Sequence, residues 1–488
     1  MEKTAIAIGG GPAGLATALM LAKSGWNNIT VLEKRPSADF YEPDKSFLYL
    51  IDGRGQKCTD FLGLSDRLAE LGVANTDVNF TVIQADGSQN TSKMPVPGSR
   101  DRKTAYWLPR STFMQLLYQE IEQNWRHCIT VLFDTVCLEI DRAIADSDGS
   151  EKLKVIAKNN NEGDDQNLTF ETDLLLGCDG ITSIVRKTLS KWDDSAGSKR
   201  FEMRHFPSPS SGLKYKVLTL PPQPPLNRDG SERAIPSTAY AIRGAFRDRD
   251  RAVSLGLLPR KNPDEPRTAN IITYPDRDIW KLQDGKQVFD FLETAFPQLP
   301  IDKILSSEEV ARFAESQGGQ FPDPQYCPGL FFLLSENDKN TAGVVLMGDA
   351  IHCFPPDIGQ GVNAALEDVC VLHQAISEAE NDLSRALPLY ESLRANDTAA
   401  LAKLAQIGFP WQYNQNQFRK NLWRVNVILR VLLNRLLPQI FDPPAILMIS
   451  NYNLSYDEIW RKAQKTTAIL YLLISGLAIA SWVSIWRF

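Results

Sequence analysis

The chain has 488 residues, a net charge of -6 and 43% hydrophobic residues, which is enough for two or three lobes with a sizeable core. The acidic balance argues against nucleic acid as a partner. The seven cysteines form no C-x-x-C pair and the four histidines are scattered, which argues against a disulfide framework and against a metal site.

The first 35 residues carry the most specific pattern of the chain. The apolar run TAIAI at 4–8 is followed directly by GGGPAG at 9–14, and residues 15–24 then have the apolar spacing of a helix. A second apolar run, 29–32, ends in Glu33. This order predicts a βαβ unit with G-x-G-x-x-G in its first turn and an acid at the end of its second strand, the pattern of a dinucleotide-binding site.

The residues of this pattern have separate physical roles. Gly9 allows the sharp turn from strand to helix, Gly11 lets a pyrophosphate approach the backbone, and Gly14 lets the helix pack on the strand. The helix N-terminus offers free N–H groups to the phosphates, and Glu33 can accept hydrogen bonds from ribose hydroxyls. A glycine-rich turn in an ordinary α/β domain would leave the triple glycine and Glu33 unexplained.

The next part of the chain alternates between helical and strand patterns. We expect a helix from 54 to about 72, a strand at 80–84, and an amphipathic helix at 111–124 that Arg110 precedes. Further on, a mostly antiparallel sheet inserted between the halves of the nucleotide domain is predicted by strand patterns at 213–220, 238–245, 252–258 and 269–274.

A second informative stretch is DLLLGCDGITSIVR at 173–186. An apolar strand ends in Asp179 and Gly180, and a helix then starts with Ser183 and carries Arg186 one turn later.

A third informative stretch runs from 344 to 368. A buried strand ends in Gly348 and Asp349, a proline-rich loop follows, and GQG at 359–361 opens a long helix. The free N–H groups at 361–363 could stabilise negative charge beyond that helix end.

The C-terminal stretch from 466 to 486 contains no charge. As a helix it would be about 30 Å long, the thickness of a bilayer core, with Trp482 and Trp486 at one end. We therefore predict a tail anchor that spans or enters a membrane, with the body on the side of the cations at 461–465, cytoplasmic or its organellar equivalent. The alternative is a terminal helix buried against the protein.

Other features favour structural roles. His352 is expected to make a structural hydrogen bond rather than to act as a base, and Cys178 and Cys353 are expected to pack. One helical stripe is expected to be core, although it could also lie along a membrane surface: Leu422, Val425, Ile428, Leu429, Leu432 and Leu436.

Together the three ordered stretches resemble the motifs of the FAD-dependent aromatic hydroxylases, the para-hydroxybenzoate hydroxylase-like flavoprotein monooxygenases. The resemblance implies an α/β fold with a Rossmann-like FAD-binding domain, an inserted antiparallel β-sheet substrate domain and a C-terminal helical region. The implied parts are an FAD domain at 1–195 and 330–400 with substrate-domain strands near 75–110, a substrate domain at 196–329, a helical region at 401–465, and the tail at 466–486.

The resemblance also assigns cofactor residues, with Asp349 on the ribityl hydroxyls and no metal. The loop that would border the isoalloxazine contains Pro355, Pro356, Gly359, Gln360 and Gly361. The residues expected to hold FAD are Gly9, Gly11, Pro12, Ala13, Gly14, Glu33, Lys34, Arg35, Arg110, Val136, Asp179, Gly180, Asp349, Gly361, Val362 and Asn363.

Within this family the chain most resembles the kynurenine 3-monooxygenases, including its C-terminal region. It departs from them where they hold the carboxylate of the amino acid with Arg, Tyr, Asn and Tyr. Here Thr81 takes the Arg position, residues 80–97 contain no Tyr, and Gly408 and Ala445 take the two C-terminal positions. Because an arginine fork is the usual partner of a half-buried carboxylate, kynurenine is not the expected substrate.

The implied reaction uses NADPH or NADH to reduce FAD, O₂ to form a flavin C4a-hydroperoxide, and transfer of one oxygen to an aromatic or quinoid small molecule. The chain has no second G-x-G-x-x-G unit for the nicotinamide, which fits transient binding. Two alternatives remain: a flavin-dependent reductase or halogenase, and a membrane-tethered flavin-binding redox sensor without turnover.

Overall fold

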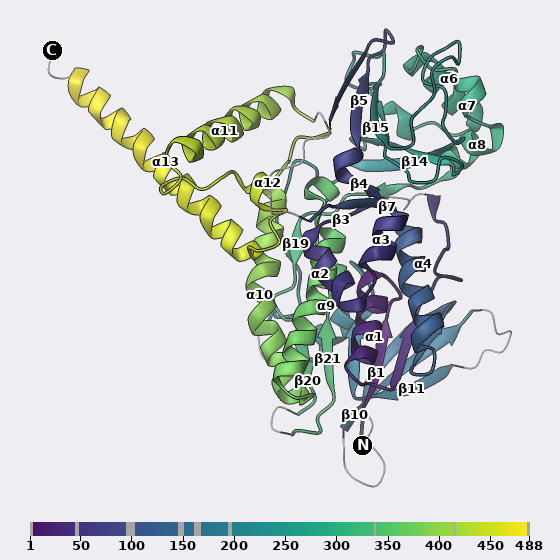
Figure 1. The fold of residues 1–488 in the computed structure, drawn as a ribbon, viewed down its shortest axis with the longest axis vertical. Coiled ribbons are helices and arrows are strands. Elements are labelled where there is room, and N and C mark those ends of the chain that lie inside the picture. Colours follow the sequence, from purple (N-terminus) through teal and green to yellow (C-terminus); the bar gives the residue numbers. More distant parts are fainter. Residues whose placement is uncertain are drawn as a thin grey trace.

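The computed structural model describes residues 3–43, 48–93, 103–144, 151–160, 167–193, 198–335, 338–413 and 415–485. A six-stranded sheet in the order β20-β21-β12-β1-β2-β8 forms the centre of the lower body in Figure 1. Its strands are β1 (Thr4–Ile8), β2 (Asn28–Leu32), β8 (Ile129–Leu132), β12 (Leu174–Gly177), β20 (Phe331–Leu333) and β21 (Gly343–Leu346).

This sheet brings the three informative stretches to one edge. All its pairs are parallel except β20 with β21. Since parallel strands place their carboxyl ends together, the turns after β1, β12 and β21 are neighbours. The Cys178 N–H donates to the Ile8 carbonyl at 2.9 Å, and the Met347 N–H donates to the Gly177 carbonyl at 3.0 Å.

The helices that pack around this sheet include α1 (Pro12–Lys23), α9 (Gly361–Glu378) and α10 (Leu383–Ile407). The helix expected from 54 to 72 is two helices, α2 (Gly53–Leu62) and α3 (Ser65–Leu71). Gly63 separates them with φ 78°, a left-handed conformation that ends a helix and that glycine adopts without strain. The side chain of Asp52 caps the start of α2 by accepting from the Arg54 N–H at 2.9 Å.

The expected inserted sheet is present, and it recruits two strands from earlier in the chain. The seven-stranded sheet has the order β18-β14-β17-β16-β15-β5-β6, with only β15 and β5 parallel. Its strands are β5 (Asn79–Ile83), β6 (Gln89–Lys93), β14 (Lys214–Leu220), β15 (Thr238–Arg243), β16 (Ser254–Leu257), β17 (Arg267–Thr273) and β18 (Gly319–Gln320). Beside it lie the helices α6 (Gly285–Ala295), α7 (Ile301–Ile304) and α8 (Ser307–Glu315) (Figure 1).

Three smaller sheets and several short helices complete the body. The smaller sheets are β3 (Leu48–Ile51), β7 (Tyr106–Pro109) and β4 (Val73–Ala74); β9 (Thr135–Ile144), β10 (Glu151–Asn159) and β11 (Leu168–Thr172); and β13 (Arg204–His205), β19 (Gln325–Tyr326) and β22 (His352–Cys353). The remaining helices of the body are α4 (Arg110–Glu120), η3 (Ile121–Trp125), α5 (Ile184–Trp192), η2 (Asn75–Asp77), η4 (Asp278–Trp280), η5 (Gly348–Ala350) and η6 (Pro356–Ile358).

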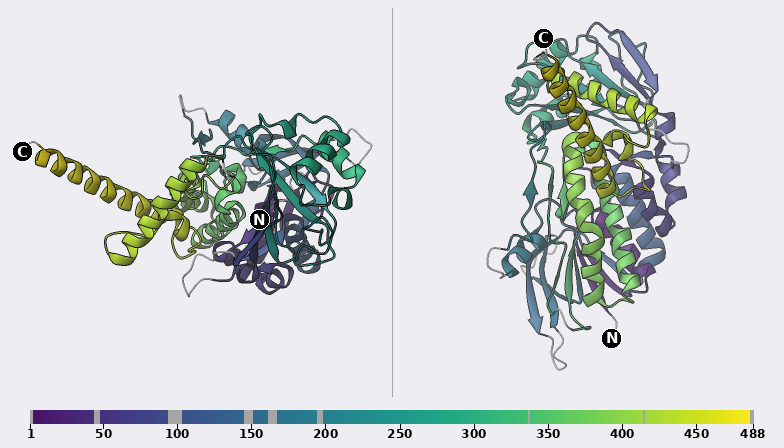
Figure 2. Two further views of the ribbon diagram at one scale, coloured as in Figure 1. Left: turned by 90° about the horizontal axis from the view of Figure 1, so that it is seen from above. Right: turned by 90° about the vertical axis from the view of Figure 1, so that its left-hand side faces the viewer.

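The C-terminal region consists of α11 (Gln417–Leu436), α12 (Ala445–Met448) and α13 (Tyr456–Ile485). Figures 1 and 2 show α13 leaving the body, with α11 beside it. The predicted boundary at 466 is not a break in structure, because α13 is one continuous helix of 30 residues. One face of its first half is buried, at Tyr456, Ile459, Ala463 and Thr466. Its second half exposes apolar side chains such as Leu472 (74% exposed) and Ile479 (64%).

Two predictions about this region are corrected. In the described part of the chain, no helix is both long and apolar enough to cross a membrane, so the predicted spanning segment is not supported; Trp486 lies outside the described residues. The alternative of a terminal helix buried against the protein does not hold for the distal half either, because its described side chains are exposed. The stripe on α11 is not core, since residues such as Leu422 (60% exposed) and Val425 (61%) face outward.

Candidate active site

The turn after β1 has the geometry that its glycines predict. Gly9 has φ 101°, and a Cβ there would lie 2.4 Å from the Cys178 carbonyl oxygen. A Cβ on Gly14 would lie 1.9 Å from the Gly9 carbonyl oxygen. Gly11 differs, because a Cβ there would meet no atom within 4 Å. The chain is therefore closed around Gly9 and Gly14 and open in front of Gly11, where α1 begins and its first N–H groups lack partners within the helix.

Glu33 holds this turn from the end of β2. One carboxylate oxygen accepts from the Gly10 N–H at 2.7 Å, and the other accepts from the Arg35 N–H at 2.9 Å. Glu33, Arg35 and Arg110 line a cleft with an empty volume of about 660 Å³, which includes some open solvent. Arg110, the first residue of α4, pairs with Glu42 at 3.4 Å in the same cleft. Of the other residues predicted here, Lys34 is exposed and Val136, on β9, is half-buried.

The second stretch is tied to the third by Arg186. Asp179 accepts from the N–H groups of Ile184 at 2.6 Å and Val185 at 3.2 Å, so its carboxylate holds the start of α5. The guanidinium of Arg186 donates from Nη1 to the Ala350 carbonyl at 2.5 Å and from Nη2 to the Ile181 carbonyl at 2.7 Å. Burial raises the pKa of Asp179, with hydrogen bonds from Ser183 and the backbone opposing it.

Asp349 projects from the tight turn that follows β21. Its side chain is exposed and makes no hydrogen bond with any described residue. The surrounding protein nevertheless raises its pKa by desolvation, while His352 and Arg110 oppose that shift. The turn itself is fixed, because Gly348 has φ 60° and donates its N–H to Asp368 at 2.8 Å. A rigidly placed carboxylate without an internal partner suits a ligand that brings hydroxyl groups.

His352 has the structural role that its position predicts. Its Nε2 atom lies 2.9 Å from a carboxylate oxygen of Asp368, and both side chains are fully buried. Cys178 and Cys353 are packing residues as expected, because burial raises the pKa of both thiols and so keeps them protonated.

The loop before α9 is open on one side. A Cβ at Gly359 or Gly361 would meet no atom within 4 Å, and Gly359 has φ 61°. Asn363 and Val362 are buried, and the Asn363 side chain is used inside the protein: it accepts from the Asp52 N–H at 3.0 Å and donates to the Leu50 carbonyl at 2.8 Å. What these residues can offer a ligand is therefore their backbone N–H groups at the start of α9.

Comparison with known proteins shows the family of the chain. A family model described as an FAD binding domain matches residues 2–204 and 335–403, more than half of the chain. The chain belongs to the family of FAD-dependent monooxygenases.

The alignments with its relatives cover almost the whole of this chain. Kynurenine 3-monooxygenase of Sus scrofa is 24% identical over 480 residues, which covers 96% of this chain and 90% of the relative. Two solved structures share the fold: tetracycline destructase Tet(51), with TM-score 0.56 and 17% identity over 92% of this chain and 98% of its own, and PqsL of P. aeruginosa in complex with 2-aminobenzoylacetate, with TM-score 0.52 and 19% identity over 87% and 99%. The monooxygenase is therefore an oxidoreductase that uses FAD.

The residues present fit FAD. Open backbone at Gly11 offers room for a pyrophosphate, and the preceding residue, Gly10, lines the cleft together with Glu33 and Arg110. Asp349 lies where the third stretch meets the first, because a Cβ on the adjacent Gly348 would be 3.3 Å from the Ala13 side chain. The turn at Gly359 is also open. No group of three or more His, Cys, Asp or Glu side chains that could hold a metal ion is found among the described residues.

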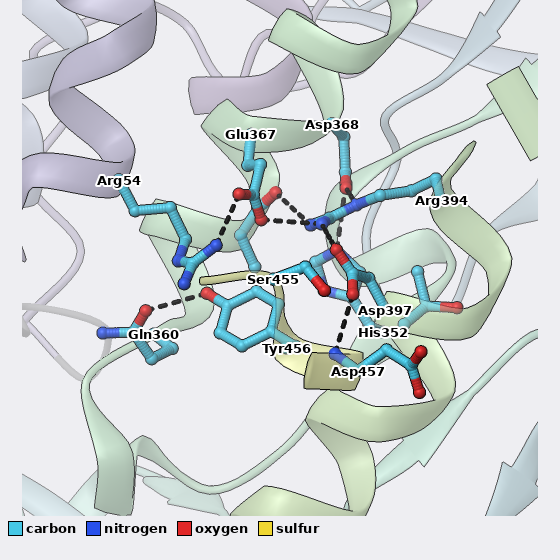
Figure 3. Close-up of polar contacts among 12 residues, drawn as sticks. Arg54, His352, Gln360, Glu367, Asp368, Arg394, Asp397, Ser455, Tyr456 and Asp457 are labelled. Carbon is cyan, nitrogen blue, oxygen red and sulfur yellow. Dashed lines mark hydrogen bonds and ion pairs between the residues drawn. The ribbon is translucent and has the colours of Figure 1, made fainter. Parts of the chain in front are cut away.

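The sequence did not reveal the ion network behind this site (Figure 3). Glu367 accepts from Arg54 at 2.5 Å and from Arg394 at 2.6 Å, and Asp368 accepts from Arg394 at 2.6 Å. Burial alone would raise the pKa of Asp368, but His352 and Arg394 outweigh it and hold that pKa below its usual value. The available signal was the position of Glu367 and Asp368 in the otherwise apolar run 364–372. Two acids in such a run demand buried cationic partners, but the run does not say which residues these are.

Proposed function

We propose that this monooxygenase uses NADPH or NADH to hydroxylate an aromatic or quinoid small molecule other than kynurenine, on a Rossmann-like FAD domain. When bound, FAD would carry electrons from the nicotinamide to O₂ and supply the oxygen atom. The protein's part is to orient: the turn at Gly11 for the pyrophosphate, Asp349 for the ribityl hydroxyls, and the N–H groups at the start of α9 for developing negative charge on the ring.

The observation that carries the substrate proposal is the packing at Thr81, Gly408 and Ala445, the positions that correspond to three of the four carboxylate partners in the kynurenine enzymes. Thr81 is 3% exposed, and its hydroxyl lies 2.9 Å from that of Thr91. A Cβ on Gly408 would lie 2.5 Å from the Cγ2 atom of Ile358, in the loop at 355–361, so a side chain there requires Ile358 to shift. Ala445 is buried in the same apolar cluster as Ile358. A carboxylate placed here would lose several kcal/mol of pairing, which supports a less polar substrate.

The cofactor part of the proposal is tested with purified protein. Wild type should be yellow and retain FAD. Gly11→Val should fold, because space is open there, but should lose FAD because the new side chain occupies the pyrophosphate position. Asp349→Ala should bind FAD about tenfold more weakly, through loss of a charge-assisted hydrogen bond. Full FAD occupancy in both variants would show that the site is misplaced.

The substrate part is tested by a screen. Aromatic and quinoid compounds are compared for stimulation of NADPH oxidation coupled to a hydroxylated product, with kynurenine in the same plates. We expect a compound without a free amino-acid carboxylate to stimulate turnover more than kynurenine does. Efficient kynurenine hydroxylation would refute the substrate proposal, and substrate turnover without O₂ would favour the reductase alternative.

We further propose that the body rests at a membrane surface, on the cytoplasmic side or its organellar equivalent. In the described chain, most of the exposed large apolar side chains lie on α11, on the distal half of α13 and on the segment between them. The α11 sequence contains Arg and Lys but no Asp or Glu, although the whole chain is acidic. A basic helix with an exposed apolar stripe is the kind of surface that lies on anionic lipid.

Vesicle flotation tests this location. Full-length protein should float with anionic vesicles, less with neutral ones, and Leu422→Glu with Ile428→Glu should abolish flotation without loss of FAD. Self-association in place of flotation would instead identify this surface as an interface between two copies of the chain.

A further inference from the structure

Gln360 is the middle residue of the turn that would face the isoalloxazine, yet its side chain faces the protein. It is 3% exposed, and both ends of its amide are used. The Nε2 atom donates to Asp52 at 2.8 Å, and the Oε1 atom accepts from the Tyr456 hydroxyl at 2.8 Å. A side chain held at both ends fixes the backbone that carries it, here between two glycines whose own conformations are permissive.

Tyr456 is the first residue of α13 and comes from the far end of the sequence. It is fully buried, with the Arg54 guanidinium 4.0 Å from the centre of its ring (Figure 3). Burial raises the pKa of Tyr456 well above its usual value, with Arg54 opposing, so the hydroxyl stays protonated and donates to Gln360.

The start of α13 is itself held by several contacts. Arg54 donates to the carbonyls of Leu454 at 2.7 Å and Asn451 at 3.2 Å, just before the helix. The Asp457 N–H donates to Asp397 of α10 at 2.8 Å. The position of the Tyr456 hydroxyl is therefore determined by the flavin domain on one side and by the C-terminal helix on the other.

We propose that Tyr456 is a positioning residue for the flavin: through Gln360, the first turn of α13 sets the Gly359–Gly361 turn and the N–H groups that follow it. The proposal rests on FAD binding as proposed above. It makes the C-terminal helix part of the active site, so that movement of α13 changes how the flavin ring is held.

The test compares Tyr456→Phe with Tyr390→Phe. Tyr390 is an equally buried tyrosine of the core around the six-stranded sheet, and its hydroxyl donates to the Leu346 carbonyl at 3.2 Å. Both variants should lose a similar, small amount of thermal stability. Only Tyr456→Phe should bind FAD more weakly, about two- to tenfold from the loss of one neutral hydrogen bond, and only it should shift the visible absorption bands of the bound flavin.

A double-mutant cycle asks whether the effect passes through Gln360. If it does, Tyr456→Phe should change FAD affinity much less in a Gln360→Met background than in wild type. Additive effects, or a Tyr456→Phe protein with wild-type FAD affinity and spectrum, would overturn the proposal. If wild type binds FAD but shows no NADPH turnover, the proposed function fails while the positioning role stands; if wild type takes up no FAD, both fail.

Discussion

The two halves of α13 belong to one helix but have opposite surroundings. The first half is part of the core: Tyr456, Ile459 and Thr466 are 0% exposed. In the second half Leu472 is 74% exposed and Trp482 62% exposed. The more apolar half is thus the one that the body leaves exposed, whereas the half with charged residues such as Arg461 has one face buried against the body. The hydrophobicity of a segment shows that it can be buried in an apolar environment. Whether it is buried depends on whether the fold places other apolar surfaces against it.

The largest expected effect comes from removing Arg394, the cation that pairs with Glu367 and Asp368 beside the first half of α13. Arg394→Met would leave Glu367 and Asp368 buried with fewer partners, at a cost of about 3–5 kcal/mol in the free energy of unfolding. Urea unfolding would measure it, with Arg419→Met on exposed α11 as the control. Equal stability of the two variants would mean that the network contributes nothing.

The sharpest comparison uses the same residue type in both halves. Ile459→Ala removes a fully buried side chain from the apolar cluster shared with α10, and we expect a loss of about 2–5 kcal/mol. Ile474 is 62% exposed, so Ile474→Ala should change stability by less than about 0.5 kcal/mol. Thermal unfolding without lipid would show both, and a comparable loss from Ile474→Ala would mean that the distal half packs on the protein in solution.

The smallest effect concerns Asp357, a buried carboxylate in the loop at 355–361. Burial raises the pKa of Asp357 to about 6, and Ser210, Gln412 and Tyr413 oppose that shift only in part. Because the folded-state pKa lies above the unfolded value, the ionised group destabilises the fold, and the stability it costs returns as the pH falls from about 6 to about 4.

Asp357→Asn should therefore raise the free energy of unfolding at pH 7.5 by about 1–2 kcal/mol, and the melting temperature with it. The gain should vanish near pH 4. Glu367 and Asp368 have lowered pKa values and behave oppositely, losing their contribution as the pH falls through those values. A gain from Asp357→Asn that is independent of pH would show that Asp357 is not the titrating group.

The sequence by itself determined the nucleotide-binding turn and the strands around it. Strand, glycine turn and helix lie within 35 residues, and each glycine has a local reason, such as the contact of Gly14 with Gly9, that the pattern already contains. The alternation of the inserted sheet is equally local, because strand periodicity depends on successive side chains. Its junction with β5, by contrast, could not be read from either segment alone.

Only the tertiary structure decided which residues pair in the buried ion network around Glu367 and Asp368, and whether the C-terminal helix is buried or exposed. Arg54 and Glu367 are 313 positions apart, and Tyr456 and Gln360 are 96 apart. A buried charge requires a partner, but its own neighbours in sequence do not specify which one. In the same way, composition predicted a spanning segment at 466–486 and a core stripe on α11. The described side chains of the distal half of α13 and of the α11 stripe are exposed because the folded body covers other apolar surfaces and leaves these open.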